Sequence, residues 1–414
     1  MRLLFLSYNG TSDPLLHTQG VAYLADFPRR GVTVHLLTYE KRVKASQARR
    51  TQTLQDQTEF TRLGIRWHRM RYHKWPPVLS TWFDVVCGWF YVWYLVMRCR
   101  ITVLHARGTI PAAIAAPIAY LTGVPWLFDL RGVVTEEYVD GGMWRRGSWV
   151  HRWVGVVERG LIRQAKAMVV LTERAAEILT HNPTWRLRPG VVPQVIPCCV
   201  DVERFATLNS STEPKELTGL AGCFTVVYVG SLGTWYLCEE MMAFFRRILA
   251  QRPEAQLLMV VSEGHQTTAH RLLRHMPGAQ SHVTVVSSPP SAVPQHLRAA
   301  HVGLAFIKPA FSKQFSSPTK IGEYLASGIP VVVNQGVGDL DHFVRRHRVG
   351  VVLPAMEPAS YQQGVEELFA LLRDETLAAR CRQAAREHLS LTVGRERYWQ
   401  TYQAMLRNRG PALS

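Results

Sequence analysis

The sequence predicts an α/β protein built from two successive doubly wound domains, each with a parallel sheet between layers of helices. Three observations carry this prediction. Short apolar strands alternate with helical stretches along the chain, a polar interval at residues 208–219 interrupts the alternation, and 414 residues that are 47% hydrophobic exceed what one ordinary core holds. Ligands of such sheets bind outside the carboxyl ends of the strands, so the two domains are expected to face a central cleft.

The first domain is expected at residues 1–207, followed by residues 208–219 as a linker. Residues 1–10 have only a short apolar core before polar turn residues, which indicates a first β-strand and not a signal peptide. The strands predicted for this domain are Leu3–Ser7, Val32–Leu37, Ile101–His105, Trp126–Asp129, Ala167–Leu171 and Val195–Ile196.

The second domain is expected at residues 220–385, and residues 386–414 are expected to form a C-terminal helix that returns to the first domain. The alternation of strands and helices is the same as in the first domain. The strands predicted here are Phe224–Val229, Gln256–Val261, Val283–Val286, Val302–Phe306, Pro330–Val333 and Gly350–Leu353.

A short helix before the strand Pro330–Val333 has the features of a phosphate-binding site. Ser317 stands at its expected N-cap, Pro318 at its first helical position and Gly328 just past its end. The free N–H groups of the first turn and the positive end of the helix dipole attract an anion, and Lys320 adds a full charge on the same side.

Glu323 follows Lys320 by three residues and is expected on the same helix face, one turn deeper. Its carboxylate is then placed to accept hydrogen bonds from the hydroxyls of a ribose attached to the phosphate. The ligand implied is a nucleotide. The alternative is an ordinary helix–strand unit without a ligand, because short motifs match frequently by chance.

The net charge of +17 is uneven, since residues 1–200 hold 26 Lys and Arg against 13 Asp and Glu. The N-terminal half is therefore expected to prefer an anionic partner, a class that includes nucleic acid, anionic lipid headgroups and phosphorylated substrates. The sequence contains no groove-reading or base-stacking motif, so nucleic acid is not an expected partner.

Seven scattered cysteines, set mostly in apolar runs, indicate a reduced cytoplasmic protein. Cys198 and Cys199 are adjacent, but no second Cys or His pair stands at ligand spacing, which favours a buried structural role. His265, His270 and His275 follow one another in steps of five and do not share a helix face. No metal bound by the protein is expected.

Residues 78–97 are nearly all apolar, include a cluster of aromatic side chains and are flanked by basic residues. Their length approaches that of a membrane span. Asp84 and Gly88 within the segment favour instead an aromatic helix on or beside the sheet. A buried core helix and an interfacial membrane-binding helix are both open alternatives, and the basic surplus favours peripheral contact with an anionic membrane.

The segment from Ser317 to Val332 resembles the donor-binding helix of retaining glycosyltransferases of the GT-B fold, family 4, in spacing and in residue types. The resemblance covers nearly the whole chain. It implies transfer of a sugar from a nucleoside-diphosphate sugar to an acceptor, with no cofactor and no metal. Weaker segments match in the same order along the chain: Asp13–Leu15 with Gln19–Gly20, Leu104–Gly108, Phe128–Gly132, Ile196–Asp201 and Tyr228–Gly233.

By this resemblance Lys320 and the helix N-terminus hold the donor diphosphate and Glu323 binds the ribose, and both are expected catalytic residues. Fixed positive charge aimed at the leaving diphosphate lowers the barrier to breaking the sugar–phosphate bond. The loop at Gly230 permits close backbone approach to the phosphates. The donor-binding residues implied are Gly230, Ser231, Leu232, Ser317, Pro318, Thr319, Lys320, Gly322 and Glu323.

The chain departs from the family pattern at two places. Phe315 stands where the motif often carries a first glutamate, so one expected contact to the donor sugar is missing. Tyr236 lies in a loop where many members place Arg and Lys, and this loop has no basic residue. Lys320 is therefore expected to act more alone, with Lys308 or Lys313 as candidate helpers.

On the acceptor side, Asp129 ends an apolar strand and is expected to face the cleft as a catalytic carboxylate, which orients the acceptor hydroxyl or stabilises the oxocarbenium. The alternative is an Asp129 that caps a helix or braces a loop. For His105 the alternative is a buried, hydrogen-bonded histidine. The other residues expected on this side are Asn9, Gly10, Gln19, Gly20, His105, Arg107, Arg131 and Glu136.

The expected function is that of a cytoplasmic glycosyltransferase, peripheral at the inner face of the membrane. It would move a hexose-type residue with retention to a lipid-linked or polysaccharide acceptor in surface glycan biosynthesis. Two alternatives are a nucleotide-sugar epimerase of the same architecture and a non-catalytic protein that keeps the donor site. An altered free sugar made without acceptor would indicate the first, and nucleotide binding without turnover the second.

Overall fold

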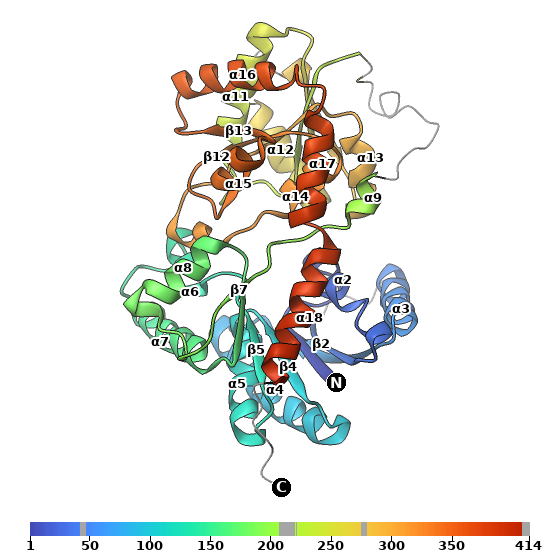
Figure 1. Ribbon diagram of the computed structural model, residues 1–414, viewed down its shortest axis with the longest axis vertical. Helices are drawn as coiled ribbons and strands as arrows, with labels where there is room; N and C mark the ends of the chain where they lie inside the picture. The colour runs from blue at the N-terminus through green and yellow to red at the C-terminus, as the bar shows by residue number, and fades with distance from the viewer. Residues whose placement is uncertain (42–46, 207–219, 221, 275–279, 408–414) are drawn as a thin grey trace. The chain divides into compact units, whose positions relative to one another are not determined.

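The computed structural model (Figure 1) describes residues 1–41, 47–206, 220, 222–274 and 280–407. Contacts divide the chain into an N-terminal unit, Met1–Pro197 with Gly394–Ser414, and a C-terminal unit, Cys198–Val393. The expected domain limits were 207, 220 and 385, and the linker expected at 208–219 lies outside the described residues. Each unit contains one parallel sheet and its covering helices, which confirms the predicted α/β fold class.

The sheet of the N-terminal unit has seven parallel strands in the order β3-β2-β1-β4-β5-β6-β7. The direction of winding changes between β1 and β4, so the loops after these two strands lie at the switch point where ligands of such sheets bind. The strands are β1 Arg2–Ser7, β2 Thr33–Lys41, β3 Ile65–Tyr72, β4 Val103–Arg107, β5 Trp126–Asp129, β6 Ala167–Val170 and β7 Gln194–Val195.

Strand β3 is the one strand of this sheet that the sequence pattern did not predict. It lies at the edge of the sheet, paired only with β2 among the described strands. Arg66, Arg69 and Arg71 are exposed on it, so the segment looks like a basic stretch and its apolar side is hard to recognise. Charged side chains on an edge strand also oppose pairing with another chain.

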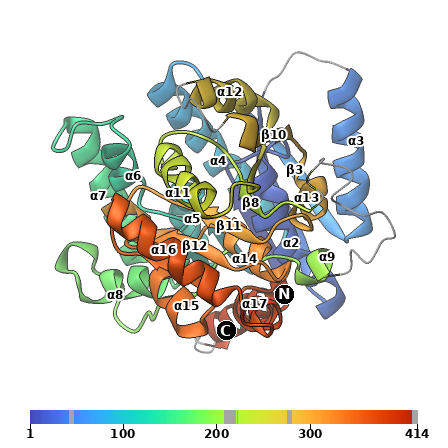
Figure 2. The same cartoon turned by 90° about the horizontal axis from the view of Figure 1, so that it is seen from above.

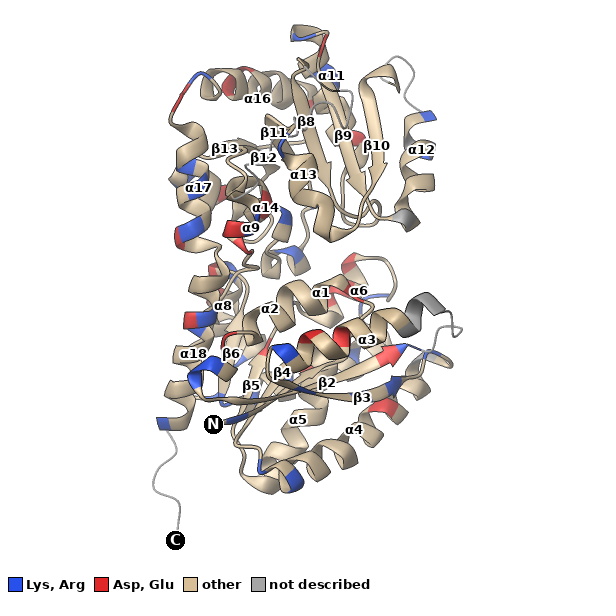
Figure 3. Ribbon diagram, turned by 90° about the vertical axis from the view of Figure 1, so that its right-hand side faces the viewer, with Lys and Arg blue, Asp and Glu red and all other residues tan. Residues whose placement is uncertain are grey.

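Helices cover both faces of this sheet, with α3 on one face and α4 and α5 on the other (Figure 3). At the C-terminal end of the chain, Tyr402 of α18 packs edge-on against Phe27 and Tyr398 against Tyr23, with ring centroids 5.6 and 5.2 Å apart. The helical segments are α1 Pro14–Leu16, η1 His17–Val21, α2 Ala22–Leu24, η2 Pro28–Arg30, α3 Gln47–Arg62, α4 Pro77–Cys99, α5 Thr109–Thr122, α6 Val134–Asp140, α7 Trp149–Gln164, α8 Glu173–His181, η3 Pro183–Trp185 and α18 Leu391–Arg407.

Helix α4 contains the aromatic segment, and one of its faces is fixed to the protein. Asp84 accepts hydrogen bonds from the Tyr8 hydroxyl at 2.8 Å and from the backbone N–H of His73 at 3.0 Å. A Cβ on Gly88 would stand 2.5 Å from the Tyr39 hydroxyl, so the glycine permits close packing. By length and composition the helix could cross a membrane, but only 33% of its apolar window is buried. The helix is thus packed along one face and exposed along the rest.

The sheet of the C-terminal unit has six parallel strands in the order β10-β9-β8-β11-β12-β13. All six strands expected here are present. The switch point lies between β8 and β11, so the loops that follow these strands are the expected ligand-binding loops. The strands are β8 Thr225–Val229, β9 Gln256–Val261, β10 Val283–Ser287, β11 Val302–Ala305, β12 Val331–Asn334 and β13 Gly350–Leu353.

Alternate side chains of β8 enter two different hydrophobic cores, because successive residues of a strand point to opposite faces. Val227 and Val229 pack with α14 and α17 on one face, and Val226 and Tyr228 pack with α11 and α16 on the other. Figure 2 shows α14 beside α17 and α11 beside α16. The helical segments are α9 Val202–Ala206, α11 Cys238–Gln251, η4 Glu263–His265, α12 Gln266–Arg274, η5 Gln280–His282, η6 Pro290–Ala292, α13 Val293–Leu297, η7 Phe311–Phe315, α14 Thr319–Ala326, α15 Leu340–His347, α16 Pro358–Leu371 and α17 Leu377–His388.

Candidate functional site

The phosphate-binding helix expected from the sequence is α14, and it begins differently from the prediction. Its N-cap is Pro318 in an extended conformation, and no side chain caps it. Ser317 is therefore not the N-cap: its hydroxyl accepts a hydrogen bond from the backbone N–H of Cys198 at 3.2 Å. The helix starts at Thr319, and Gly328 follows its end with a φ of 80°, as expected. No described side chain caps the first turn, so the N–H groups of Thr319 and Lys320 are available to an anion, whereas that of Ile321 donates to the Pro318 carbonyl at 3.2 Å.

Lys320, in the first turn of α14, is 6% exposed, and its Nζ has no hydrogen-bond partner within the described residues. Nζ lies 4.0 Å from the ring centroid of Tyr228 and 4.0 Å from that of Tyr236. Burial lowers the pKa of Lys320 to about 7, against the opposing effects of Glu323 and Cys238. Buried polar groups nearly always have a hydrogen-bond partner, so this amine is placed to donate a hydrogen bond to a ligand.

The loop after β8 lies directly against this lysine. Gly230 has a φ of 132°, which favours glycine, and a Cβ there would stand 3.1 Å from Nζ of Lys320, so the loop closely approaches the lysine. The Tyr228 hydroxyl donates to the carbonyl of Ser231, which ties the loop to one of the two tyrosines around Lys320. Ser231 itself is exposed, whereas Leu232 is buried in the core.

Glu323 lies one turn after Lys320 and is half-buried. Burial raises the pKa of Glu323, while Lys320 and Arg204 act in the opposite direction. Gly322 serves packing, because a Cβ there would stand 3.0 Å from a methyl group of Val200. The carboxylate and the amine thus lie on successive turns of α14, as the spacing predicts.

The two departures from the family pattern have clear positions in the structure. Phe315 is 1% exposed, with its ring 6.0 Å from that of Phe311, so it is a core residue. Of the two candidate helpers of Lys320, Lys308 is exposed. Lys313 is 8% exposed, and its Nζ lies 3.8 Å from the ring centroid of Trp235. Trp235 directly precedes Tyr236, whose ring contacts Lys320. The structure therefore favours Lys313 as the second cation near this loop.

In the N-terminal unit, Asp129 at the end of β5 is fully buried. One oxygen accepts hydrogen bonds from the Tyr398 hydroxyl at 3.0 Å and from His105 Nε2 at 3.4 Å, and the other accepts from Arg131 at 3.4 Å. Burial alone would raise the pKa of Asp129, but Arg131 and His105 lower it well below its ordinary value. This carboxylate braces its surroundings, which agrees with the alternative considered above. A catalytic role for Asp129 stays a prediction.

His105, at the centre of β4, is 1% exposed and lies between two partners. Its Nε2 faces Asp129, and its Nδ1 lies 2.5 Å from the Tyr402 hydroxyl. Burial lowers the pKa of His105, against the opposing effect of Asp129. A neutral imidazole that donates from Nε2 and accepts at Nδ1 satisfies both contacts. Sequence reasoning missed Tyr398 and Tyr402; their separation by four residues in the expected C-terminal helix is the signal that places them on one face.

Residues of the loop after β1 extend this network. Gln19, which is 2% exposed in the π-helical segment η1, accepts a hydrogen bond from Arg131 at 3.3 Å and so connects the loop to Asp129. A Cβ on Gly20 would meet a methyl group of Leu16 at 3.3 Å, which indicates a packing role. Gln19, His105, Asp129 and Arg131 are therefore brought together as the sequence predicts.

Asn9 and Gly10 lie elsewhere in the same loop. Asn9 donates to the carboxylate of Asp13, and a Cβ on Gly10 would stand 2.7 Å from a carboxylate oxygen of Glu40. The backbone N–H of Thr11 donates to Glu40 at 3.1 Å. Asn9 is thus engaged within the loop, and Gly10 allows the loop to approach Glu40 of β2.

Arg107 and Glu136 are less closely connected to Asp129. Arg107 ends β4, is half-buried and helps to lower the pKa of Asp129. Glu136 of α6 forms an ion pair with Arg146 at 2.7 Å. The start of α6 is held by Glu158, a fully buried residue that sequence reasoning missed and that accepts from the backbone N–H of Val134 at 2.9 Å.

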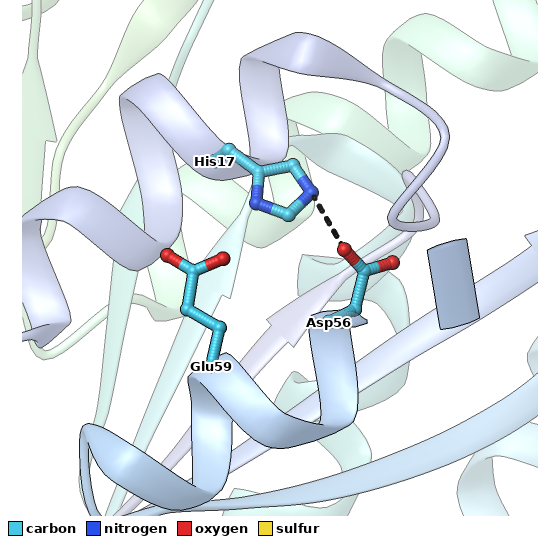
Figure 4. A group of neighbouring side chains, drawn as sticks. All are labelled: His17, Asp56 and Glu59. Carbon is cyan, nitrogen blue, oxygen red and sulfur yellow. Dashed lines mark ion pairs between the residues drawn. The ribbon is translucent and has the colours of Figure 1, made fainter. Parts of the chain in front are cut away.

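Figure 4 shows a separate group, in which His17 of η1 lies between Asp56 and Glu59 of α3. Their ligand atoms lie within 4.8 Å of one another, so the group could hold a metal ion. Protein atoms already engage part of it: His17 Nε2 lies 3.0 Å from the Thr11 carbonyl, and Gln52 donates to Asp56 at 3.0 Å. The absence of a bound metal stays a prediction, and this group is the place to test it.

Two family models match the chain. The model described as Glycosyl transferase 4-like domain matches residues 21–194, and the model described as Glycosyl transferases group 1 matches residues 223–370. Together these ranges cover more than half of the 414 residues. No curated protein sequence matches the chain significantly.

Solved structures of similar fold cover both units. A glycosyltransferase from Rickettsia africae has a TM-score of 0.74 and 12% identity, with 98% of this chain and 99% of that chain covered. HepE from Anabaena in complex with UDP and glucose has a TM-score of 0.69 and 14% identity, with 98% and 100% covered. WaaG, a glycosyltransferase involved in lipopolysaccharide biosynthesis, has a TM-score of 0.65 and 15% identity, with 99% and 100% covered. At these identities the likeness shows the fold.

Proposed function

Because the chain belongs to the glycosyltransferases of the GT-B fold, with a glycosyl transferase 4-like domain followed by a glycosyl transferases group 1 domain, we propose that it transfers a sugar from a nucleoside-diphosphate sugar with retention of configuration. The observation that carries the proposal is Lys320, a buried amine for which no described residue is a hydrogen-bond partner, beside a helix N-terminus that no described side chain caps. Glu323 on the next turn is the proposed ribose ligand.

In the proposed reaction, the bond between the anomeric carbon of the sugar and the diphosphate oxygen breaks. A new bond forms from that carbon to the acceptor hydroxyl, on the same face of the sugar, and the hydroxyl proton passes to the departing diphosphate. Lys320 and the first-turn N–H groups of α14 stabilise the negative charge that develops on the diphosphate. No metal ion and no cofactor is needed for this step. The nucleoside-diphosphate sugar is a substrate.

The donor site is tested by measuring thermal stabilisation with UDP, GDP, ADP and CMP and with their sugar conjugates. A ligand that binds only the folded chain raises its stability by mass action. We expect one nucleotide family to stabilise the native chain and to do so less in Lys320→Ala and Glu323→Ala. Leu54→Ala, on the exposed surface of α3, is the matched control. Stabilisation by none of the nucleotides would contradict the proposal, and binding without turnover on any acceptor would leave a non-catalytic binding protein.

We further propose that the enzyme works at the cytoplasmic face of an anionic membrane, on a lipid-linked or polysaccharide acceptor of surface glycan biosynthesis. The support is an exposed apolar surface on the N-terminal unit. Trp82 of α4 packs against Trp153 of α7, with ring centroids 5.6 Å apart, so the two helices share it. In Figure 3 acidic residues are scarce along α4, and basic residues stand at its C-terminal end. The exposed apolar side chains are Leu79, Trp82, Phe83, Phe90, Trp93, Tyr94 and Met97 on α4 and Trp149, Trp153 and Val156 on α7.

Aromatic side chains and basic residues on one surface are typical of proteins that bind at the lipid interface. Arg98 and Arg100 at the end of α4, and Arg145 and Arg152 near the start of α7, are exposed and supply the complementary charge. Because one face of α4 is packed on the protein, peripheral contact fits better than a membrane span.

Co-sedimentation with vesicles tests the membrane contact. We expect the native chain to bind vesicles that contain an anionic lipid at low salt and not to bind neutral vesicles. The double variant Phe90→Glu with Trp93→Glu should lose at least tenfold in binding, since two charges on an interfacial face oppose insertion. Leu54→Glu, also on an exposed helix position, should bind as the native chain does. A native chain that ignores anionic vesicles contradicts this part of the proposal and leaves the donor chemistry untouched.

A further inference from the structure

The surroundings of Lys320 explain more than the attraction of an anion. Its amine stands between the rings of Tyr228, from the end of β8, and Tyr236, from the loop after it, at 4.0 Å from each ring centroid. The other titratable groups that act on it are Glu323 on the same helix and Cys238 at the start of α11. We call the two rings of Tyr228 and Tyr236 the lysine cage.

The cage removes water from the amine, and no described residue replaces the lost hydrogen bonds. The attraction between a cation and an aromatic face is weaker than the penalty for burying an ion, even after the protein relaxes. Desolvation therefore outweighs the attraction of the rings, and it favours the uncharged amine. This agrees with the direction in which burial moves the pKa of Lys320.

We propose that the lysine cage keeps Lys320 largely as a neutral amine in the empty site above neutral pH, and that the diphosphate of the bound donor draws one proton onto it. The inference rests on the proposed donor site and adds how that site recognises its ligand. The proton comes from the solvent, Nζ becomes an ammonium, and no bond of the donor changes. The full positive charge is then present only when a diphosphate is there to pair with it.

Among the neighbouring groups, Glu323 is the one that could take the proton instead. Burial raises the pKa of its carboxyl. Burial likewise raises the pKa of Tyr228, Tyr236 and Cys238, and this keeps their neutral forms throughout the pH range of the test. A variant at Glu323 therefore separates the two possible proton acceptors.

Isothermal titration calorimetry in buffers of different ionisation enthalpy counts the protons taken up per donor bound. The probe is UDP-glucose, because its diphosphate has no titrating group near neutral pH, followed by GDP-mannose and ADP-glucose until one binds. With a pKa of about 7, we expect about 0.9 proton per donor at pH 8 and about 0.1 at pH 6. Affinity should fall about tenfold per pH unit well above that pKa.

Variants assign the proton to Lys320. Lys320→Arg keeps a permanent charge and should bind without proton uptake, since guanidinium does not deprotonate in proteins. Tyr236→Leu opens the cage to water and should lower the uptake at pH 8, whereas Tyr236→Phe keeps the ring and should keep the uptake. Glu323→Gln should retain the uptake.

Failure of this inference and failure of the proposed donor site give different results. Donor binding with less than about 0.2 proton at pH 8 in the native chain overturns the inference and leaves the donor site in place. Uptake that persists in Lys320→Arg, or that is unchanged in Tyr236→Leu, also overturns it. If none of the three sugar nucleotides binds, the proposed donor site fails and the inference fails with it.

Discussion

Two buried ionisable side chains, one in each unit, have opposite environments. Asp129 in the N-terminal unit is fully buried, and both of its carboxylate oxygens accept hydrogen bonds from His105, Arg131 and Tyr398. Lys320 in the C-terminal unit is 6% exposed, and its amine has no hydrogen bond within the described residues. The two side chains are buried to nearly the same extent, so their environments differ in the hydrogen-bond partners.

The partners of a buried ionisable group distinguish a structural charge from a ligand-binding one. A buried charge with all its partners in the protein stabilises the fold around it and has little left to offer a substrate. A buried polar group without partners costs stability in the empty protein, and a ligand can recover that cost on binding. By this criterion we propose Lys320 as a ligand-binding residue and Asp129 as part of the framework.

The largest effect is expected from Asp129→Ala. Removing one member of a buried ion pair leaves its partners uncompensated and costs about 3–5 kcal/mol in the free energy of unfolding. Denaturant unfolding followed by fluorescence measures the loss. Asp129→Asn keeps the shape and should lose less. An Asp129→Ala chain that keeps native stability but loses transfer activity would reverse the comparison and make Asp129 catalytic.

The same carboxylate should make stability depend on acidity. The pKa of Asp129 in the folded chain lies well below its ordinary value of about 3.9. Its contribution is therefore complete above about pH 4 and is lost as the pH falls further towards the lower folded value. The difference in unfolding free energy between the native chain and Asp129→Asn should shrink over that window. A difference that does not change with pH would contradict the role of the charge.

Lys320→Met should have the opposite pattern, with a large loss of activity and little loss of stability. Removing a fixed positive donor from a transition state costs about 10²–10³ in rate. Replacing a buried, unpaired amine by an apolar side chain of similar length is neutral or stabilising. Initial rates at saturating donor and thermal unfolding of the empty chain measure the two effects. A Lys320→Met chain that unfolds much more easily would show that the amine has a structural partner.

The apparent stability of the empty chain should also rise with pH because of Lys320. Its pKa of about 7 in the folded chain lies below the ordinary value of about 10.4, so the unfolded chain binds more protons between these two values. The unfolding free energy then increases with pH through that window. The native chain should gain more stability than Lys320→Met between pH 7 and pH 10, and equal gains would contradict the lowered pKa.

Much of the fold could be predicted from the sequence because apolar strands of parallel sheets are buried on both faces. Trp126–Asp129 and Gly350–Leu353 have the expected bounds for this reason. Strand β3 could not be recognised, since an edge strand with exposed arginines has no continuous apolar run. The start of α14 was misplaced because Ser317 has a distant partner, Cys198, that outcompetes the local cap.

The candidate site divides in the same way. The positions of Lys320, Glu323 and Gly230 could be predicted because they depend on local spacing along a helix and after a strand. The partners of Asp129 could not, since Tyr398 lies 269 positions away along the chain and no local pattern pairs the two. The lysine cage was hidden for the same reason, because Tyr228 in β8 and Tyr236 in the loop after it are far from Lys320 along the chain and look like core residues.

Tyr398→Phe should have the smallest effect and gives the finest test of the comparison. The substitution removes one hydroxyl that donates to the Asp129 carboxylate at 3.0 Å and leaves the ring in its core position. A hydrogen bond to a charged group contributes about 1.5–3 kcal/mol, and the contacts of His105 and Arg131 persist, so a loss near the lower limit is expected. Tyr120→Phe, on an exposed ring of α5, is the matched control and should change nothing. A Tyr398→Phe chain with unaltered stability but lower transfer activity would contradict the structural role of Asp129. It would indicate that Asp129 and its hydrogen-bond partners take part in the reaction.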